Sequence, residues 1–99
     1  MWKHARVAVV MPAYLEGRMI ERALAAVPAY VDDVVVVDDG SPDDTFARAE
    51  EVAQRDPRVR VVRHAVNRGV GAALVTGYRE AFSAGCEVAV VMAGDGQMD

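Results

Sequence analysis

The chain has 99 residues, of which 53% are hydrophobic and 26% are charged, and its acidic residues outnumber the basic ones to give a net charge of −4. This balance is typical of a folded segment and excludes a disordered chain. Net negative charge and a single lysine, Lys3, disfavour general binding to nucleic-acid phosphates, so we expect no nucleic-acid partner. The length accommodates one small domain at most.

The chain carries neither a disulfide pair nor a membrane-spanning run. Cys86 is its one cysteine, and no apolar run approaches the roughly 20 residues that a membrane helix needs. The first apolar run, at residues 7–12, is too short for a signal peptide. We therefore expect a cytoplasmic location, or one at the cytoplasmic face of a membrane that is reached through residues beyond Asp99.

Four short valine-rich runs recur along the chain, at residues 7–11, 34–37, 59–62 and 88–92. Valine favours strands because its branched side chain packs well on a pleated surface. Three of the runs lack polar residues, which indicates strands buried on both faces of a sheet. Arg60 interrupts the third run, so we expect that strand nearer an edge.

Three segments with helical spacing separate these runs. The first ends at Pro28, which cannot continue a helix. The second opens at Ser41, which we expect to cap the helix, with Pro42 in the first helical position. The third is predicted from about residue 67 to residue 84, with Gly85 as its stop.

The resulting order β-α-β-α-β-α-β predicts an α/β fold with a parallel sheet and helices on its faces. Ligands of such sheets bind beyond the carboxyl ends of the strands, where the loops 12–16, 38–41 and 93–99 lie. A carboxylate at this edge can accept hydrogen bonds from a base or ribose, or bind a divalent cation. The adjacent Asp38 and Asp39 are expected to point in different directions, so that one holds the loop and the other faces a ligand.

The same residues also fit an interpretation in which they have only structural roles, in turns and helix starts. The Asp-Gly and Ser-Pro-Asp sequences within residues 39–43 are common signals for turns and helix starts. His4 and His64 have no partners at metal-ligand spacing and are interpreted as ordinary residues. The chain has no Gly-x-x-x-x-Gly-Lys-Ser/Thr phosphate loop, and residues 69–74 match a dinucleotide fingerprint only in part.

Four motifs together are more specific than any one of them. In chain order they are Ala8-Val9-Val10-Met11-Pro12-Ala13-Tyr14-Leu15-Glu16, Val35-Val36-Val37-Asp38-Asp39-Gly40-Ser41-Pro42-Asp43-Asp44-Thr45, Asn67-Arg68-Gly69-Val70-Gly71-Ala72-Ala73 and Met92-Ala93-Gly94-Asp95-Gly96-Gln97. With this order and spacing the chain resembles the family 2 glycosyltransferases from Val7 to Asp99. Among them it is most similar to the dolichyl-phosphate mannose synthase type, which makes polyprenyl-phosphate sugars.

The resemblance implies a Rossmann-like GT-A fold whose N-terminal part, residues 1–99, binds a nucleotide-diphosphate sugar and stops after the Asp-x-Asp-like loop. The nucleotide-sugar-binding residues that it implies are Pro12, Ala13, Tyr14, Glu16, Val37, Asp39, Arg68, Gly71, Gly94 and Asp95. The metal residues that it implies are Asp95 and Gln97, which would bind Mg²⁺ or Mn²⁺. The metal would neutralise charge on the leaving nucleoside diphosphate.

The implied reaction is transfer of a sugar, with inversion, from a GDP- or UDP-sugar to a polyprenyl or dolichyl phosphate. Two positions depart from the family pattern. Leu15 stands where the family commonly has asparagine, and Ala93 stands where it commonly has the first aspartate of Asp-x-Asp. We expect the acceptor site and any catalytic base beyond Asp99, so the 99 residues alone would be inactive.

Other functions stay open. A non-catalytic nucleotide-sugar-binding module or fragment would fit Ala93 and the expected absence of an acceptor half. A nucleotidyltransferase would also bind a nucleotide on an α/β sheet, but it usually needs a glycine-rich, basic first loop, for which residues 12–18 offer only Gly17 and Arg18. Likeness of fold alone does not decide between them.

Overall fold

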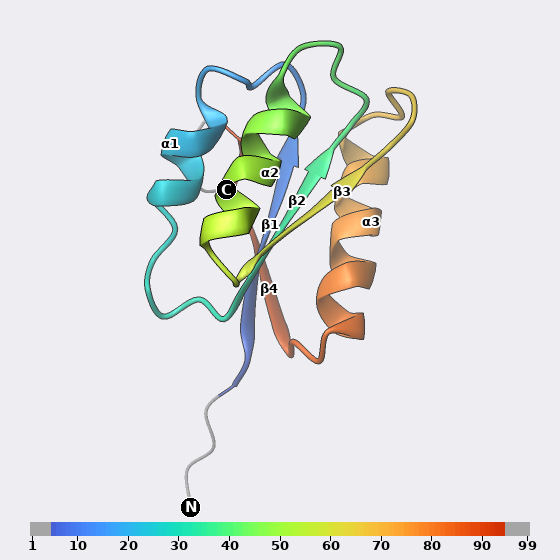
Figure 1. The fold of residues 1–99 in the computed structure, drawn as a ribbon. Coiled ribbons are helices and arrows are strands. Elements are labelled where there is room, and N and C mark those ends of the chain that lie inside the picture. Colours follow the sequence, from blue (N-terminus) through green and yellow to red (C-terminus); the bar gives the residue numbers. More distant parts are fainter. Residues whose placement is uncertain (1–4, 95–99) are drawn as a thin grey trace, which may run out of the picture.

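A parallel four-stranded sheet forms the centre of the molecule (Figure 1). The computed structural model describes residues 5–94. The elements alternate along the chain as predicted: β1 (Val7–Ala13), α1 (Ile20–Ala25), β2 (Asp33–Asp38), α2 (Thr45–Arg55), β3 (Val59–Arg63), α3 (Val70–Ser83) and β4 (Val88–Val91). The strand order β3-β2-β1-β4 and the parallel pairing of all neighbours confirm the α/β fold class.

Helices cover both faces of the sheet, with α1 and α2 on one side and α3 on the other (Figure 1). On β1, Val9 and Met11 belong to the core on the side of α1 and α2, whereas Ala8 and Val10 belong to the core under α3. Because successive side chains of a strand point to opposite faces, a sheet with two covered faces requires strands without polar positions. The unbroken valine run of β2, which is buried throughout, meets this requirement.

The two outer strands agree with the sequence prediction only in part. β3, which contains Arg60, lies at one edge of the sheet, as expected. β4 lies at the other edge within residues 5–94, and Val88 is 43% exposed, so the prediction that this run is buried on both faces is wrong for the described residues. An apolar run indicates that a strand prefers to be buried, but it does not indicate which strands lie beside it in the sheet.

The start of α2 also differs from the prediction. The helix begins at Thr45 rather than at Pro42, and Ser41 does not cap it. The Ser41 hydroxyl oxygen instead accepts the backbone N–H of Leu15 at 3.0 Å. Asp43 takes part at the helix start, because its Oδ1 accepts the N–H of Thr45 at 3.1 Å.

The third helix begins later than predicted and ends where predicted. α3 starts at Val70 rather than near residue 67, because the residues before it turn back onto the end of β2. Gly85 follows the helix with a φ of 92°, a left-handed conformation that favours glycine. Among the described residues, none of the helices has the length and apolar character that crossing a membrane requires.

Small side chains allow α3 to lie close to the sheet. Its buried residues are Ala73, Gly77 and Ala81. A Cβ atom on Gly77 would collide with Cγ1 of Val10 in β1. Glycine inside a helix costs about 1 kcal/mol relative to alanine, so the close approach of helix and strand explains why this position suits glycine.

Gly77→Ala should therefore lower the free energy of unfolding by roughly 1–3 kcal/mol, because the added methyl group overpacks the core. Gly71→Ala in the first turn of the same helix is the matched control, since nothing lies within 4 Å of a Cβ there. The control should raise the free energy of unfolding by about 0.5 kcal/mol. Urea unfolding measures both, and a shift of both variants in the same direction would contradict the close packing.

Candidate functional site

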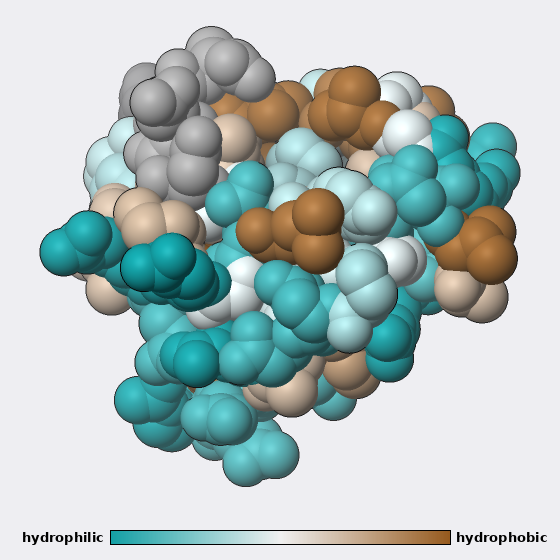
Figure 2. All heavy atoms as spheres, turned by 90° about the horizontal axis from the view of Figure 1, so that it is seen from above, coloured by the Kyte–Doolittle hydropathy of each residue, from teal (hydrophilic) through white to brown (hydrophobic). Residues whose placement is uncertain are grey.

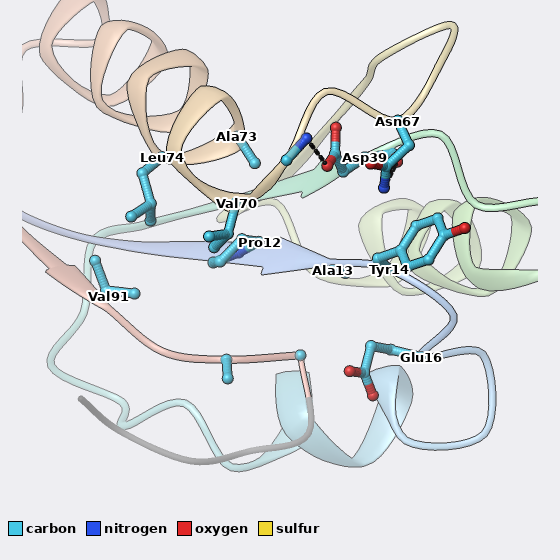
Figure 3. Close-up of a pocket in the computed structure, with 13 residues that line it drawn as sticks. Pro12, Ala13, Tyr14, Glu16, Asp39, Asn67, Val70, Ala73, Leu74 and Val91 are labelled. Carbon is cyan, nitrogen blue, oxygen red and sulfur yellow. Dashed lines mark hydrogen bonds between the residues drawn. The ribbon is translucent and has the colours of Figure 1, made fainter.

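A pocket of about 360 Å³ opens at the carboxyl edge of the sheet (Figure 3). It lies where the strand order reverses, because β2 and β3 extend the sheet on one side of β1 and β4 pairs with β1 on the other. Ligands of parallel α/β sheets bind at such switch points. The lining residues are Pro12, Ala13, Tyr14, Glu16, Asp39, Asn67, Gly69, Val70, Ala73, Leu74, Val91, Ala93 and Gly94.

The surface around this edge is mainly polar. Figure 2, which views the carboxyl edge from above, shows hydrophilic residues with apolar residues in separate small groups between them. The exposed apolar side chains near the pocket include Tyr14, Leu15 and Val70. An apolar pocket within polar surroundings suits a ligand that has both an apolar ring and polar groups.

The pocket brings together many of the residues that the sequence predicts for the nucleotide sugar: Pro12, Ala13, Tyr14, Glu16, Asp39 and Gly94. Three others do not line it. Val37 is fully buried in the core under α3, and Gly71 lies exposed in the first turn of that helix. Arg68 contributes its backbone N–H to the Asp39 carboxylate.

Several lining residues were not among the binding residues predicted from the sequence: Asn67, Gly69, Val70, Ala73, Leu74, Val91 and Ala93. Asn67, Gly69, Val70 and Ala73 belong to the third motif and Ala93 to the fourth, so these motifs already contained the signal for them. Leu74 directly follows the third motif, and only the packing of α3 beside β1 brings it to the pocket.

The loop after β1 is held by side chains of the loop after β2 and of the first residue of α2. The consecutive backbone N–H groups of residues 15–17 donate to Ser41 Oγ, Thr45 Oγ1 and Asp43 Oδ2, at 3.0, 2.9 and 3.3 Å. Ser41 and Thr45 are buried, and the Thr45 hydroxyl also donates to Asp43, which lowers the pKa of that carboxyl. These bonds fix the part of the first loop that carries Glu16 to the pocket.

Asp39 organises the opposite wall of the pocket. Its Oδ1 accepts from the His64 ring nitrogen Nδ1 at 2.8 Å and from the Arg68 N–H at 2.9 Å, and its Oδ2 accepts from the Gly69 N–H at 2.8 Å. The Asn67 side-chain amide donates to the Asp39 carbonyl oxygen at 3.1 Å (Figure 3). The loop before α3 is therefore folded onto the end of β2.

The hydrogen bonds keep Asp39 ionised although it is buried. Burial alone would raise its pKa, but the bonds from His64 and from the backbone N–H groups of Arg68 and Gly69 outweigh this effect and lower the pKa. His64, which the sequence treated as ordinary, is 7% exposed, and its Nε2 lies 2.8 Å from Thr76 Oγ1. The available signal was its place directly after a strand, at the edge where the site lies.

Asp38 and Asp39 do point to different surroundings, as predicted. Asp38 is fully buried, and its Oδ1 accepts the Ser41 N–H at 3.2 Å. Its Oδ2 has no hydrogen-bond donor among the described residues, and the Nε of Arg63 lies 3.4 Å from it. Asp38 thus holds the loop, while Asp39 lines the pocket.

The predicted metal ligands Asp95 and Gln97 lie outside the described residues. Within residues 5–94, no group of three His, Cys, Asp or Glu side chains is placed to hold a metal ion. The backbone that leads to Asp95 is fixed against the pocket, because the Gly94 N–H donates to the Pro12 carbonyl oxygen at 3.3 Å. A Cβ on Gly94 would lie 3.1 Å from Cγ of Glu16.

Leu15 should be a strained residue, because its φ of 57° is left-handed and its side chain is 53% exposed. Such a conformation costs a residue other than glycine about 1–2 kcal/mol. Leu15→Gly should raise the free energy of unfolding by about 1 kcal/mol, and Leu15→Asn by less. Leu15→Ala is the control, and an equal gain from it in urea unfolding would show that the backbone is not the cause.

Asp39→Asn should reduce stability most at neutral pH. A carboxyl whose pKa is lowered by folding contributes stability above the unfolded value of about 3.9, and the contribution is lost as the pH falls through the folded value. We expect a difference of about 2 kcal/mol between wild type and variant at pH 7, shrinking below about pH 4. Urea unfolding at several pH values measures this difference in the free energy of unfolding. A difference that does not change with pH would contradict an ionised Asp39 in the folded chain.

Residues 8–99 match the family Glycosyl transferase family 2. The chain is 30% identical to the UDP-N-acetylglucosamine–dolichyl-phosphate N-acetylglucosaminyltransferase of Methanococcus voltae, over 92% of this chain and 41% of that protein. It is 38% identical to the undecaprenyl-phosphate mannosyltransferase of Micrococcus luteus, over 92% and 38%. With the dolichol-phosphate mannosyltransferase of Pyrococcus furiosus it shares 33% identity, over 91% and 26%. The chain thus spans between 26% and 41% of the length of these relatives.

Two solved structures are similar in fold and sequence. A mannosyltransferase from Pyrobaculum calidifontis, in complex with GDP-Man and Mn²⁺, superposes with a TM-score of 0.83 at 31% identity, over 94% of this chain and 28% of that one. The glucosyl-3-phosphoglycerate synthase of M. tuberculosis gives 0.70 at 29% identity, over 92% and 35%. With its motifs gathered at one edge of a GT-A-type parallel sheet, the chain belongs to glycosyl transferase family 2.

Proposed function

We propose that this chain is the donor-binding part of a glycosyltransferase that transfers a sugar, with inversion, from a GDP- or UDP-sugar to a polyprenyl or dolichyl phosphate. The observation that carries the proposal is the pocket at the switch point, which gathers residues of all four motifs. The names of the relatives from Methanococcus and Micrococcus, with their dolichyl- and undecaprenyl-phosphate acceptors, support the lipid phosphate.

The pocket offers suitable groups for a nucleoside. Tyr14 is 42% exposed at the rim, and an aromatic ring can stack on a base. The ionised Asp39 accepts three hydrogen bonds from the protein, and a carboxylate has about four acceptor positions. One position is therefore left for an N–H of a base or an O–H of a ribose.

A divalent metal ion, Mg²⁺ or Mn²⁺, would supply charge neutralisation for the leaving diphosphate. Asp95 and Gln97 carry the oxygen ligands that such ions accept, and the fixed backbone at Gly94 leads directly to them. Mg²⁺ commonly uses one or two carboxylates with phosphates and waters, so Ala93 in place of a first aspartate is compatible with binding. A location at the cytoplasmic face of a membrane fits the lipid acceptor.

Ala93 also favours a second candidate, a nucleotide-sugar-binding module without catalysis. It lies in the pocket lining where the family commonly has a carboxylate. A transferase-type site requires the metal for tight binding of the diphosphate, whereas a module that recognises only the nucleoside does not.

Calorimetry with GDP and UDP, each with and without Mn²⁺, tests the proposal. We expect binding of one nucleotide to depend on Mn²⁺, and Asp95→Ala to weaken it by about 10- to 100-fold. Asp99→Ala is the matched control, a nearby carboxylate outside the motif, and should leave the Kd unchanged. Binding that ignores both Mn²⁺ and Asp95→Ala would favour the module, and the absence of binding to either nucleotide would overturn both candidates.

A further inference from the structure

The His64 ring is fixed between two elements that form the pocket. It follows β3, and its backbone N–H donates to the Asp38 carbonyl oxygen at 2.9 Å. Its Nδ1 lies 2.8 Å from Asp39 Oδ1, and its Nε2 lies 2.8 Å from Thr76 Oγ1 in α3. Because the residue is buried, turning the ring would break two hydrogen bonds without replacement by water.

The partners determine the direction of these hydrogen bonds. An ionised carboxylate only accepts, so Nδ1 of His64 carries a proton and donates to Asp39. In the neutral ring, Nε2 is then an acceptor, and the Thr76 hydroxyl donates to it. The chain of donors thus runs from Thr76 through His64 to Asp39.

His64 determines how the Asp39 carboxylate is presented to the pocket. Asp39 lines the pocket, whereas His64 does not, so His64 acts through Asp39. The terminal torsion of an aspartate is broad and roughly two-fold. Three donors hold the Asp39 carboxylate in one orientation. Two of them are backbone N–H groups, and the third is the His64 side chain.

We propose that His64 is a positioning residue for the nucleotide: its Nδ1–H orients Asp39 so that the remaining acceptor position faces the pocket. The Thr76 hydroxyl, 2.8 Å from Nε2, holds the other side of the ring. This inference rests on the function proposed above, but the His64–Asp39 bond can be tested without a nucleotide.

Two substitutions separate the two contacts of the ring. Asparagine places an amide N–H near the position of Nδ1, so His64→Asn can still donate to Asp39. Glutamine places its amide near the position of Nε2, so His64→Gln can reach Thr76 but not Asp39. We expect His64→Gln to weaken the Kd for GDP or UDP with Mn²⁺ by about tenfold, and His64→Asn to weaken it by less than about threefold.

A control separates positioning from a loss of stability. Arg58 lies away from the pocket and donates to the carbonyl oxygens of Pro28 and Val31 at 3.0 and 3.1 Å. Arg58→Met should lower the midpoint of thermal unfolding and leave the Kd unchanged. If His64→Asn and His64→Gln weaken binding equally, or if Arg58→Met weakens it as much as His64→Gln, the positioning role is wrong.

The ring nitrogens give a readout that needs no nucleotide. The ¹⁵N chemical shift of His64 Nδ1 in the free chain should be that of a protonated ring nitrogen. The Nε2–H tautomer would overturn the proposal. Should the chain bind neither GDP nor UDP, the proposed function fails, and the tautomer alone then decides whether His64 donates to Asp39.

Discussion

The buried carboxylate of Asp39 is the contact on which the pocket depends, because three segments distant in sequence meet on it. The end of β2 supplies the carboxylate, His64 after β3 donates to it, and the backbone before α3 donates twice. A buried carboxylate without donors would be costly. Gly40 permits the close approach, since a Cβ there would lie 2.5 Å from the Asn67 nitrogen. The same bonds that stabilise the fold thus build one wall of the site.

The other wall depends on a different kind of bond. Backbone N–H groups at 15–17 lie outside the strands and helices, and they donate to the buried hydroxyls of Ser41 and Thr45 and to the exposed carboxylate of Asp43. This arrangement holds Leu15 in a left-handed conformation. Backbone strain of this kind persists where the surroundings over-determine it, and it often occurs at functional sites. A rigid sheet edge with two fixed loops is a suitable frame for a nucleotide, whose base and ribose need groups at defined positions.

The fold could be predicted from the sequence because valine runs and helical spacing are local signals. The edge position of β4 could not, since an apolar run looks the same in a central strand. The prediction that Ser41 caps a helix was also wrong, because its hydroxyl accepts a hydrogen bond from a backbone N–H 26 residues earlier in the chain. His64 was missed for the same reason, because its partner Asp39 lies 25 residues away. The family motifs located most of the pocket, but a motif also contains residues such as Val37 that pack the core.

The most direct measurement is a titration of the ¹⁵N-labelled chain with GDP and UDP in the presence of Mg²⁺, followed by amide chemical shifts. If the carboxyl-edge pocket binds the nucleotide, the largest changes will fall on Tyr14, Asp39 and Gly69 in its lining. A second pocket between α1 and α2, lined by residues that include Arg55 and Arg58, should show no comparable change. Changes centred on that second pocket, or none at saturating concentrations of either nucleotide, would contradict a nucleotide site at the carboxyl edge.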